Sequence, residues 1–100
     1  TIGVDSDQYL LYKESNPERA QFIVTSMLKN VGASLYRALE MHLAGTLPYG
    51  EVENLGIEEN GVGIADNENF RAIVPQAFIE RIRDAEQKIK AGEITVETAF

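Results

Sequence analysis

Residues 1–12 read TIGVDSDQYLLY, and they contain the pattern that decides the fold. The apolar start, TIGV, is typical of a short buried strand, which we predict over residues 1–4. This strand runs directly into Asp5, Ser6 and Asp7. In open α/β sheets, ligands bind beyond the carboxyl ends of the strands, so two carboxylates at such an end mark a candidate site.

The segments that follow continue an α/β pattern. Residues 21–27 (QFIVTSM) contain a β-branched and aromatic run, which is typical of a second buried strand. The hydrophobic period then changes, because apolar residues recur every three or four positions from Leu28 to Leu43. This spacing predicts an amphipathic helix, and Gly45 and Pro48 suit its end.

The second half of the chain predicts a hairpin and another helix. Residues 51–57 and 62–65 flank an Asn-Gly pair, which favours the positive φ angles of a hairpin turn. A second amphipathic helix begins near Pro75 and ends before Gly92. We predict a closing strand or an extended tail over residues 94–98. The order strand, strand, helix, hairpin, helix indicates an α/β fold with too few strands for a complete doubly wound sheet.

The composition excludes several classes of function. The chain has 100 residues and a formal net charge of −7, which repels phosphate backbones, so we expect no nucleic-acid partner. It has no cysteine, which removes disulfides, thiol catalysis and zinc–thiolate sites. No apolar run approaches the roughly 18 residues of a membrane span. The start of the chain lacks the basic segment of a signal peptide. Because the chain opens within a predicted strand, we expect a fragment whose beginning lies upstream.

The candidate ligand residues follow the two predicted strands. Asp5 and Asp7 leave the first strand, while Thr25 and Ser26 leave the second, and Lys29 is predicted in the first turn of the next helix. Carboxylates accept hydrogen bonds from vicinal hydroxyls, and a lysine ammonium donates to the same oxygens, so a sugar is a sensible ligand. The alternative interpretation is that the aspartates cap a turn and the lysine is solvated.

Other polar groups have simpler structural interpretations. His42 has no Ser, Asp or Cys at a useful spacing, so we predict a surface or packed helix residue. Residues 61–63 lack the third glycine of a dinucleotide fingerprint. The acidic residues around Glu58 and Asp66 lack the spacing of a calcium loop, so we predict no metal site and no cofactor. An acid–base pair of aspartates is a minority interpretation with no other catalytic group in support. The aromatic residues predicted to lie in the core are Phe22, Tyr36 and Phe78.

Four segments in this order resemble a known family: GVDSDQ, TSMLKNVGASLYRALE, LGIEENGVGIADN and VPQAFIERIRDAEQKIKAGEITVETA. They are similar to the C-terminal part of the basic membrane protein (Bmp) family, which includes the purine nucleoside receptor lipoproteins of ABC transporters. The resemblance covers nearly the whole chain. It implies a type I periplasmic-binding-protein fold, in which two Rossmann-like lobes close on a ligand.

The resemblance also implies a domain organisation. Residues 1–100 would be a single C-terminal fragment of a two-lobe substrate-binding protein. Residues 1–48 would supply a strand, strand and helix of the second lobe, and residues 49–100 a crossover hairpin and the terminal helix. The family's signal peptide and lipid-bearing cysteine lie far upstream, so the membrane would be reached only through an N-terminal lipid anchor absent from this chain.

The implied function is that of an extracytoplasmic, membrane-anchored lipoprotein that binds a nucleoside, with a purine as the expected base, and delivers it to ABC permease subunits. Asp5, Asp7 and Lys29 would contact the ribose hydroxyls. Which aspartate faces the cleft stays open, since alternate side chains of an extended segment share a face and both could do so, with Ser6 pointing away.

Two alternatives to nucleoside uptake remain. One is a ligand-sensing regulatory or surface protein of the same fold, and the less favoured one is a nucleoside hydrolase. Our main interpretation is a protein that is not an enzyme. Because half of the cleft would be missing, we expect the isolated chain to bind nucleosides weakly and to associate with itself through exposed sheet.

Overall fold

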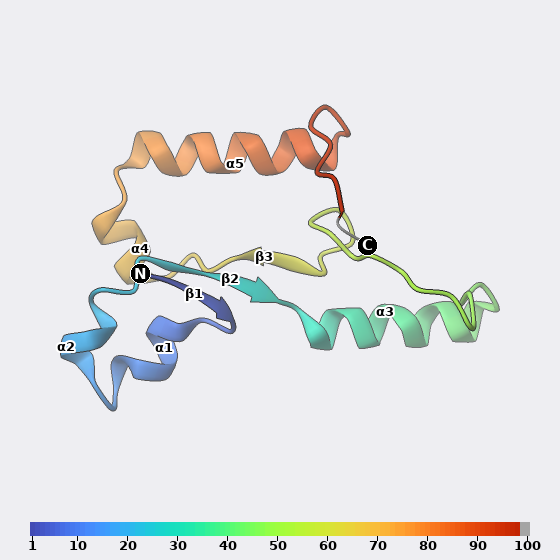
Figure 1. Cartoon of the computed structure of the whole chain (residues 1–100), viewed down its shortest axis with the longest axis horizontal. Coiled ribbons are helices and arrows are strands. Elements are labelled where there is room, and N and C mark those ends of the chain that lie inside the picture. The colour runs from blue at the N-terminus through green and yellow to red at the C-terminus, as the bar shows by residue number, and fades with distance from the viewer. Residues whose placement is uncertain (99–100) are drawn as a thin grey trace.

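The computed structural model describes residues 1–98, in which five helices surround a mixed sheet of three strands (Figure 1). In chain order the elements are β1 (Ile2–Asp5), α1 (Gln8–Lys13), α2 (Pro17–Ala20), β2 (Thr25–Lys29), α3 (Val31–Ala44), β3 (Val62–Ile64), α4 (Glu68–Ile73) and α5 (Gln76–Lys90).

The sheet has the order β1–β2–β3, with β1 parallel to β2 and β3 antiparallel to β2. Asp5 lies opposite Leu28, so β1 and β2 end at the same edge. Helices α1 and α2 form the crossover between the two parallel strands, and α3 continues outward from the end of β2 (Figure 1). Helix α5 runs along the other side of the sheet, beyond β3.

Three sequence predictions are confirmed, although α3 begins at Val31 rather than at Leu28. The first strand was expected over residues 1–4 and is β1, and the two amphipathic helices are α3 and α5. Gly45 ends α3 with a φ of 74°, and Thr46 N donates to Met41 O at 2.8 Å. Gly92 has a φ of 76° just beyond α5, as a helix-ending glycine should.

The predicted hairpin is wrong. In the described structure residues 51–57 form no strand, and the strand at Val62–Ile64 pairs with β2 instead. The Asn-Gly pair does make a tight turn, because Asn60 has a φ of 58° and Gly61 N donates to Gly56 O at 2.9 Å. The turn is preceded by a loop rather than by a strand, and β3, which follows it, pairs with β2 and completes a sheet that begins sixty residues earlier in the chain.

Three short helices were not predicted. Asp7 caps α1, Asn16 caps α2 and Asn67 caps α4, each by accepting hydrogen bonds from backbone N–H groups of the first turn. The second strand is also displaced, since the expected residues 21–27 become β2 at Thr25–Lys29. Residues 95–98 form no strand, which leaves the extended tail as the correct alternative within the described range.

The described core is small and lies around β2, α2 and α4. Its buried apolar residues are Ala20, Ile23, Ala65, Phe70 and Ile79. The aromatic side chains predicted to be core are exposed instead, with relative exposures of 68% for Phe22, 64% for Tyr36 and 53% for Phe78. The apolar character of these side chains predicts burial, but the other described residues do not cover them.

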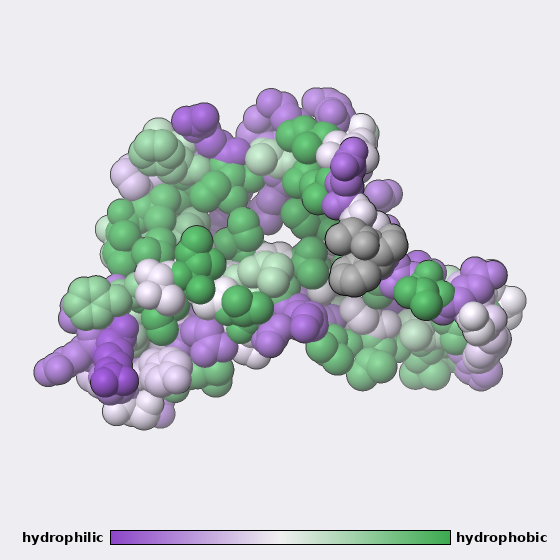
Figure 2. Space-filling view, in the orientation of Figure 1, coloured by the Kyte–Doolittle hydropathy of each residue, from purple (hydrophilic) through white to green (hydrophobic). Residues whose placement is uncertain are grey.

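The shape of the chain is extended for its size. Its radius of gyration is 16.2 Å, against about 13 Å for a compact domain of this length. It exposes 7540 Å², whereas a compact monomer of this mass exposes about 5,700 Å². Figure 2 shows hydrophobic side chains at the surface along α3. The exposed apolar residues of this helix are Val31, Leu35, Tyr36, Leu39 and Leu43.

Candidate ligand-binding site

The carboxyl ends of β1 and β2 bring two of the three predicted ligand residues into contact. Asp5 is the last residue of β1, and its Oδ1 lies 2.9 Å from Nζ of Lys29, the last residue of β2. Lys29 therefore ends a strand rather than beginning a helix, as the sequence had suggested. Both side chains are more than half exposed. An exposed ion pair of this kind contributes at most about 1 kcal/mol to stability, so it leaves both groups available to a ligand.

The backbone at Asp5 is unusual. Its φ is 71°, and Ser6 N donates to Val4 O at 2.9 Å, so the chain makes a three-residue γ-turn centred on Asp5. Positive φ is uncommon outside glycine and is best tolerated by Asn and Asp. The segment is thus not extended through Asp5, and the alternation of side chains along a strand does not apply to Asp5 and Asp7. The turn presents the carboxylate at the edge of the sheet.

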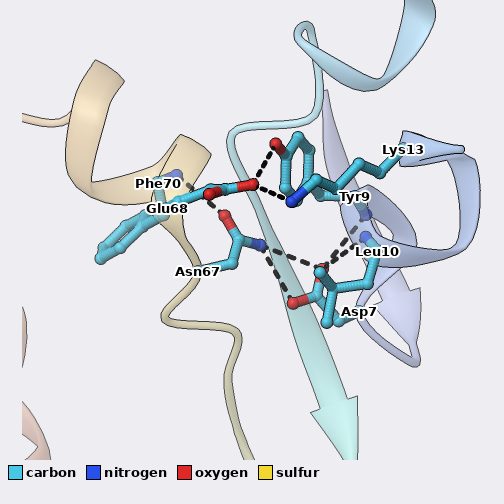
Figure 3. A network of polar contacts seen from close by, with 7 residues as sticks. All are labelled: Asp7, Tyr9, Leu10, Lys13, Asn67, Glu68 and Phe70. Carbon is cyan, nitrogen blue, oxygen red and sulfur yellow. Dashed lines mark hydrogen bonds and ion pairs between the residues drawn. The ribbon is translucent and has the colours of Figure 1, made fainter. Parts of the chain in front are cut away.

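Asp7 has a structural role, in line with the alternative interpretation in which the aspartates act as caps. Its Oδ1 accepts hydrogen bonds from Tyr9 N at 3.1 Å and Leu10 N at 3.4 Å, which caps α1. The amide Nδ2 of Asn67 donates to both carboxylate oxygens of Asp7, at 3.0 Å each (Figure 3). Asp7 is half-buried. A carboxylate oxygen has two lone pairs, so Oδ2, with its bond from Asn67, keeps capacity for a further donor.

A second contact ties α1 to α4 beside Asp7. The Tyr9 hydroxyl donates to Glu68 Oε1 at 2.9 Å, and Lys13 Nζ pairs with the same oxygen (Figure 3). The hydrogen bond from Lys13, together with the bond from Tyr9, holds the pKa of Glu68 below its ordinary value. The bond to Glu68 in turn raises the pKa of Tyr9. The first turn of α4 is therefore fixed against α1 at two points.

The packing of α1 on the sheet depends on Gly3 and Ser26. Ser26 is fully buried, and its Oγ accepts a hydrogen bond from Gln8 N at 3.1 Å. A Cβ atom at Gly3 would clash with Ser26 Oγ and with the Gln8 side chain. The absence of a side chain at Gly3 lets the start of α1 reach the sheet, and this contact places Asp7. Thr25 and Ser26 begin β2 rather than leave it, and Thr25 Oγ1 donates to Ala65 O at 2.8 Å.

The sequence analysis missed Asn67 and Glu68. Both lie in the acidic stretch around Asp66, for which the sequence predicts no metal site. An asparagine three residues before Phe70 is a helix-capping signal that could have been recognised. Its contact with Asp7 joins residues 60 positions apart, and nothing in the local sequence marks that contact.

The remaining polar candidates have structural partners. His42 Nδ1 contacts the Tyr49 hydroxyl on the surface, with the two rings edge to face at a centroid distance of 6.1 Å. Asp66 pairs with Arg71 and Arg83, and the hydrogen bond from Arg71 is the main reason that the pKa of Asp66 is lowered. Across the described residues, no group of three or more His, Cys, Asp or Glu side chains is arranged to hold a metal ion.

Two hollows mark the described surface away from the candidate site. A small one of about 60 Å³ lies between β3 and α5 and is lined by residues such as Phe70 and Ile82. A larger groove of about 640 Å³ lies between the loop around Ile57 and the segment that follows α5. Asp5, Asp7 and Lys29 line neither of these two hollows, and the Asp5–Lys29 pair lies exposed at the edge of the sheet. Among the helices of residues 1–98, none combines the length and apolar character needed to span a bilayer.

Comparison with known proteins places this geometry in a family. The model of the Bmp family, described as ABC transporter substrate-binding protein PnrA-like, matches residues 1–99. The chain belongs to the Bmp family. The Bmp chain is also similar to a solved solute-binding protein of an ABC transporter system from Aeropyrum pernix K1, with 24% identity and a TM-score of 0.63.

The structural match covers 97% of the Bmp chain and 32% of the solved protein, so the chain spans about a third of that relative's length. The likeness shows the fold. It confirms the predicted α/β class and the periplasmic-binding-protein fold, of which the Bmp chain forms a part. The predicted boundary near residue 48 stays a prediction, although β3 joins the same sheet as β1 and β2.

Proposed function

We propose that this Bmp chain is part of an extracytoplasmic solute-binding protein that captures a nucleoside between two lobes and delivers it to an ABC permease. The full-length protein would be held at the membrane by an N-terminal lipid. Its mechanism is reversible capture by closure of the lobes, without covalent chemistry. A purine nucleoside is the expected ligand, and the residues that read the base would lie outside this chain.

The observation that carries the proposal is the pairing of Asp5 with Lys29 at the carboxyl edge of β1 and β2, in a chain of the Bmp family. This edge is where open α/β sheets bind ligands. A carboxylate next to an ammonium group offers acceptors and donors to the two adjacent hydroxyls of a ribose. Asp7 follows two residues later and adds a second carboxylate at the start of the crossover.

The openness of the site supports a two-lobe arrangement. In residues 1–98, Asp5 and Lys29 line an exposed edge of the sheet, and Asp7 is half-buried at the N-cap of α1. Small-molecule sites bury most of their ligand's surface, so a second surface has to close over a nucleoside bound here. We therefore expect the isolated chain to bind nucleosides weakly. We also expect it to self-associate through its exposed sheet and through exposed apolar side chains such as those along α3.

The test is calorimetric titration of the full-length protein that contains residues 1–100 with guanosine, inosine, adenosine, cytidine, riboflavin and free ribose. Asp5→Asn and Asp7→Asn are the informative variants, because asparagine tolerates the positive φ at Asp5 and the capping position at Asp7. Lys29→Ala completes the set. Each change should weaken nucleoside binding by about 1–3 kcal/mol, which is the cost of losing a hydrogen bond to a charged group.

The matched control for Lys29 is Lys88→Ala. Lys88 also makes an exposed ion pair with an aspartate, at 2.7 Å from Asp84, but it lies on α5 away from the candidate site. Its replacement should leave affinity unchanged. A folded full-length protein that gives no heat with any of the nucleosides would refute the proposed ligand class. Release of free base and ribose during the incubation would indicate a hydrolase instead.

A further inference from the structure

Asp7, one of the proposed ligand residues, is in contact with Asn67, which is not one of them. Asn67 begins α4 and is separated by 60 positions from Asp7, yet its Nδ2 lies 3.0 Å from each carboxylate oxygen (Figure 3). The terminal torsion of an aspartate is broad, so capping bonds to Oδ1 alone leave the plane of the carboxylate poorly fixed. A single amide nitrogen that bonds both oxygens fixes that plane.

Asn67 is itself held rigidly. Its Oδ1 accepts a hydrogen bond from Phe70 N at 2.9 Å, and Phe70 is one of the buried residues of the core. The neighbouring Glu68 holds the same turn of α4 against Tyr9 and Lys13 of α1. The amide that contacts Asp7 is thus supported by packed structure rather than by a mobile loop.

We propose that Asn67 is a positioning residue for the ligand site, which orients the Asp7 carboxylate so that its Oδ2 can accept a ribose hydroxyl. This inference rests on the proposed nucleoside-binding function. A carboxylate that is oriented before the ligand arrives costs less ordering on binding, so the contact raises affinity without touching the ligand. The β3–α4 segment then contributes to the site although it supplies no ligand contact.

The test is a double-mutant cycle between Asn67→Ser and Asp7→Asn in the full-length protein that contains residues 1–100. Serine still caps α4 but is too short to replace the asparagine amide at Asp7. The probe is the tightest-binding of guanosine, inosine and adenosine. Asn67→Ser alone should weaken binding about tenfold, equivalent to about 1.4 kcal/mol. In the Asp7→Asn background the same change should alter affinity less than twofold.

The matched control is Asn69→Ser. Asn69 is also an asparagine of α4 whose amide makes long-range bonds, at 2.8 Å to Ile23 O and 3.3 Å to Gln21 O, but it does not contact Asp7. Its loss should lower thermal stability by an amount similar to Asn67→Ser and leave affinity within twofold. This comparison separates positioning of Asp7 from a general loosening of α4.

The outcomes distinguish the inference from the function on which it rests. If Asp7→Asn weakens binding but Asn67→Ser has no effect, or the same effect in both backgrounds, the positioning role of Asn67 is refuted while the nucleoside site stands. If wild-type protein binds none of the three nucleosides, or Asp7→Asn binds as well as wild type, the proposed role of Asp7 fails and the inference fails with it.

Discussion

The corner where α1 meets α4 and the helix α3 differ in what holds their side chains. In the α1–α4 corner, hydrogen bonds join Asn67 to Asp7 across 60 positions of sequence and Tyr9 to Glu68 across 59. Helix α3 has a regular apolar stripe, but Leu35, Leu39 and the other apolar side chains of that stripe are exposed in the described structure. One region is fixed by contacts within this chain, and the other has a packing surface without a visible partner.

The two regions therefore differ in how far their side chains are packed within this chain, and not in their type of secondary structure. Both regions are built from helices, with side-chain N-caps on α1 and α4 and a left-handed glycine cap at the C-terminus of α3. A helix in water gains most of its stability from packing of its apolar face. We therefore expect substitutions in the α1–α4 corner to change the stability of this chain, and substitutions on the apolar face of α3 to change its association with other surfaces.

The largest effect is expected from Gly3→Ala. The new methyl group would clash with buried Ser26 and with Gln8, so α1 would be pushed away from the sheet. Overpacking of this kind costs about 1–3 kcal/mol, which urea unfolding followed by circular dichroism would measure. The matched control is Gly32→Ala on α3, where a Cβ meets no described atom within 4 Å. It should stabilise the chain by up to about 1 kcal/mol. Equal effects at the two glycines would contradict the contrast between the regions.

A smaller effect, confined to acid, is expected from Glu68→Gln. The bonds from Lys13 and Tyr9 lower the pKa of Glu68 in the folded chain. A carboxyl group with a lowered folded pKa stabilises the fold above its unfolded pKa, and this stabilisation is lost as pH falls through the folded value. Wild type should lose stability below about pH 4.5 more steeply than the variant, as judged by thermal midpoints from pH 7 to pH 3.

The control for the acid experiment is Asp84→Asn, which removes one negative charge from an exposed ion pair on α5. If Asp84→Asn reduced the loss of thermal stability at acid pH as much as Glu68→Gln does, the effect would come from net charge and not from the α1–α4 corner.

The smallest effect on folding is expected from Leu39→Lys. Leu39 is 55% exposed in the middle of α3, so its replacement should change the unfolding free energy of this chain by less than about 0.5 kcal/mol. Sedimentation velocity should nevertheless show less self-association, because the apolar stripe is interrupted by a charge. A loss of several kcal/mol in the isolated chain would mean that α3 is already packed. Unchanged association would mean that a different surface mediates it.

The parts of the fold that the sequence predicts are those set by local periodicity. The helices α3 and α5 have 14 and 15 residues, long enough for the apolar stripe to repeat several times. The helices α1, α2 and α4 have four to six residues, too few for such a stripe, and their capping residues are the main local signal. The pairing of β3 with β2 is a choice between distant partners, which the pattern of residues 51–57 could not reveal.

The sequence could predict only the part of the candidate site that follows from the topology of the sheet. Parallel strands end at one edge of a sheet, and this rule was enough to expect Asp5 near the residues that follow the second strand. The direct ion pair with Lys29 depends on where β2 ends, which the sequence placed two residues too early. Asn67 was missed because its role depends on a contact between distant segments. The aromatic residues were predicted to lie in the core because their hydrophobicity favours burial. Hydrophobicity does not indicate which surface buries them.

The left-handed turn at Asp5 has a consequence for how random mutations at this position would be tolerated. Single-base changes convert an aspartate codon into codons for asparagine, glycine, alanine, valine and several other residues. Glycine adopts a φ of 71° readily and asparagine tolerates it better than most residues, whereas β-branched valine does not. A library selected for folding alone should therefore keep asparagine and glycine at position 5, while selection for ligand capture should keep aspartate, so sequencing the two populations would separate what the backbone requires from what the ligand requires.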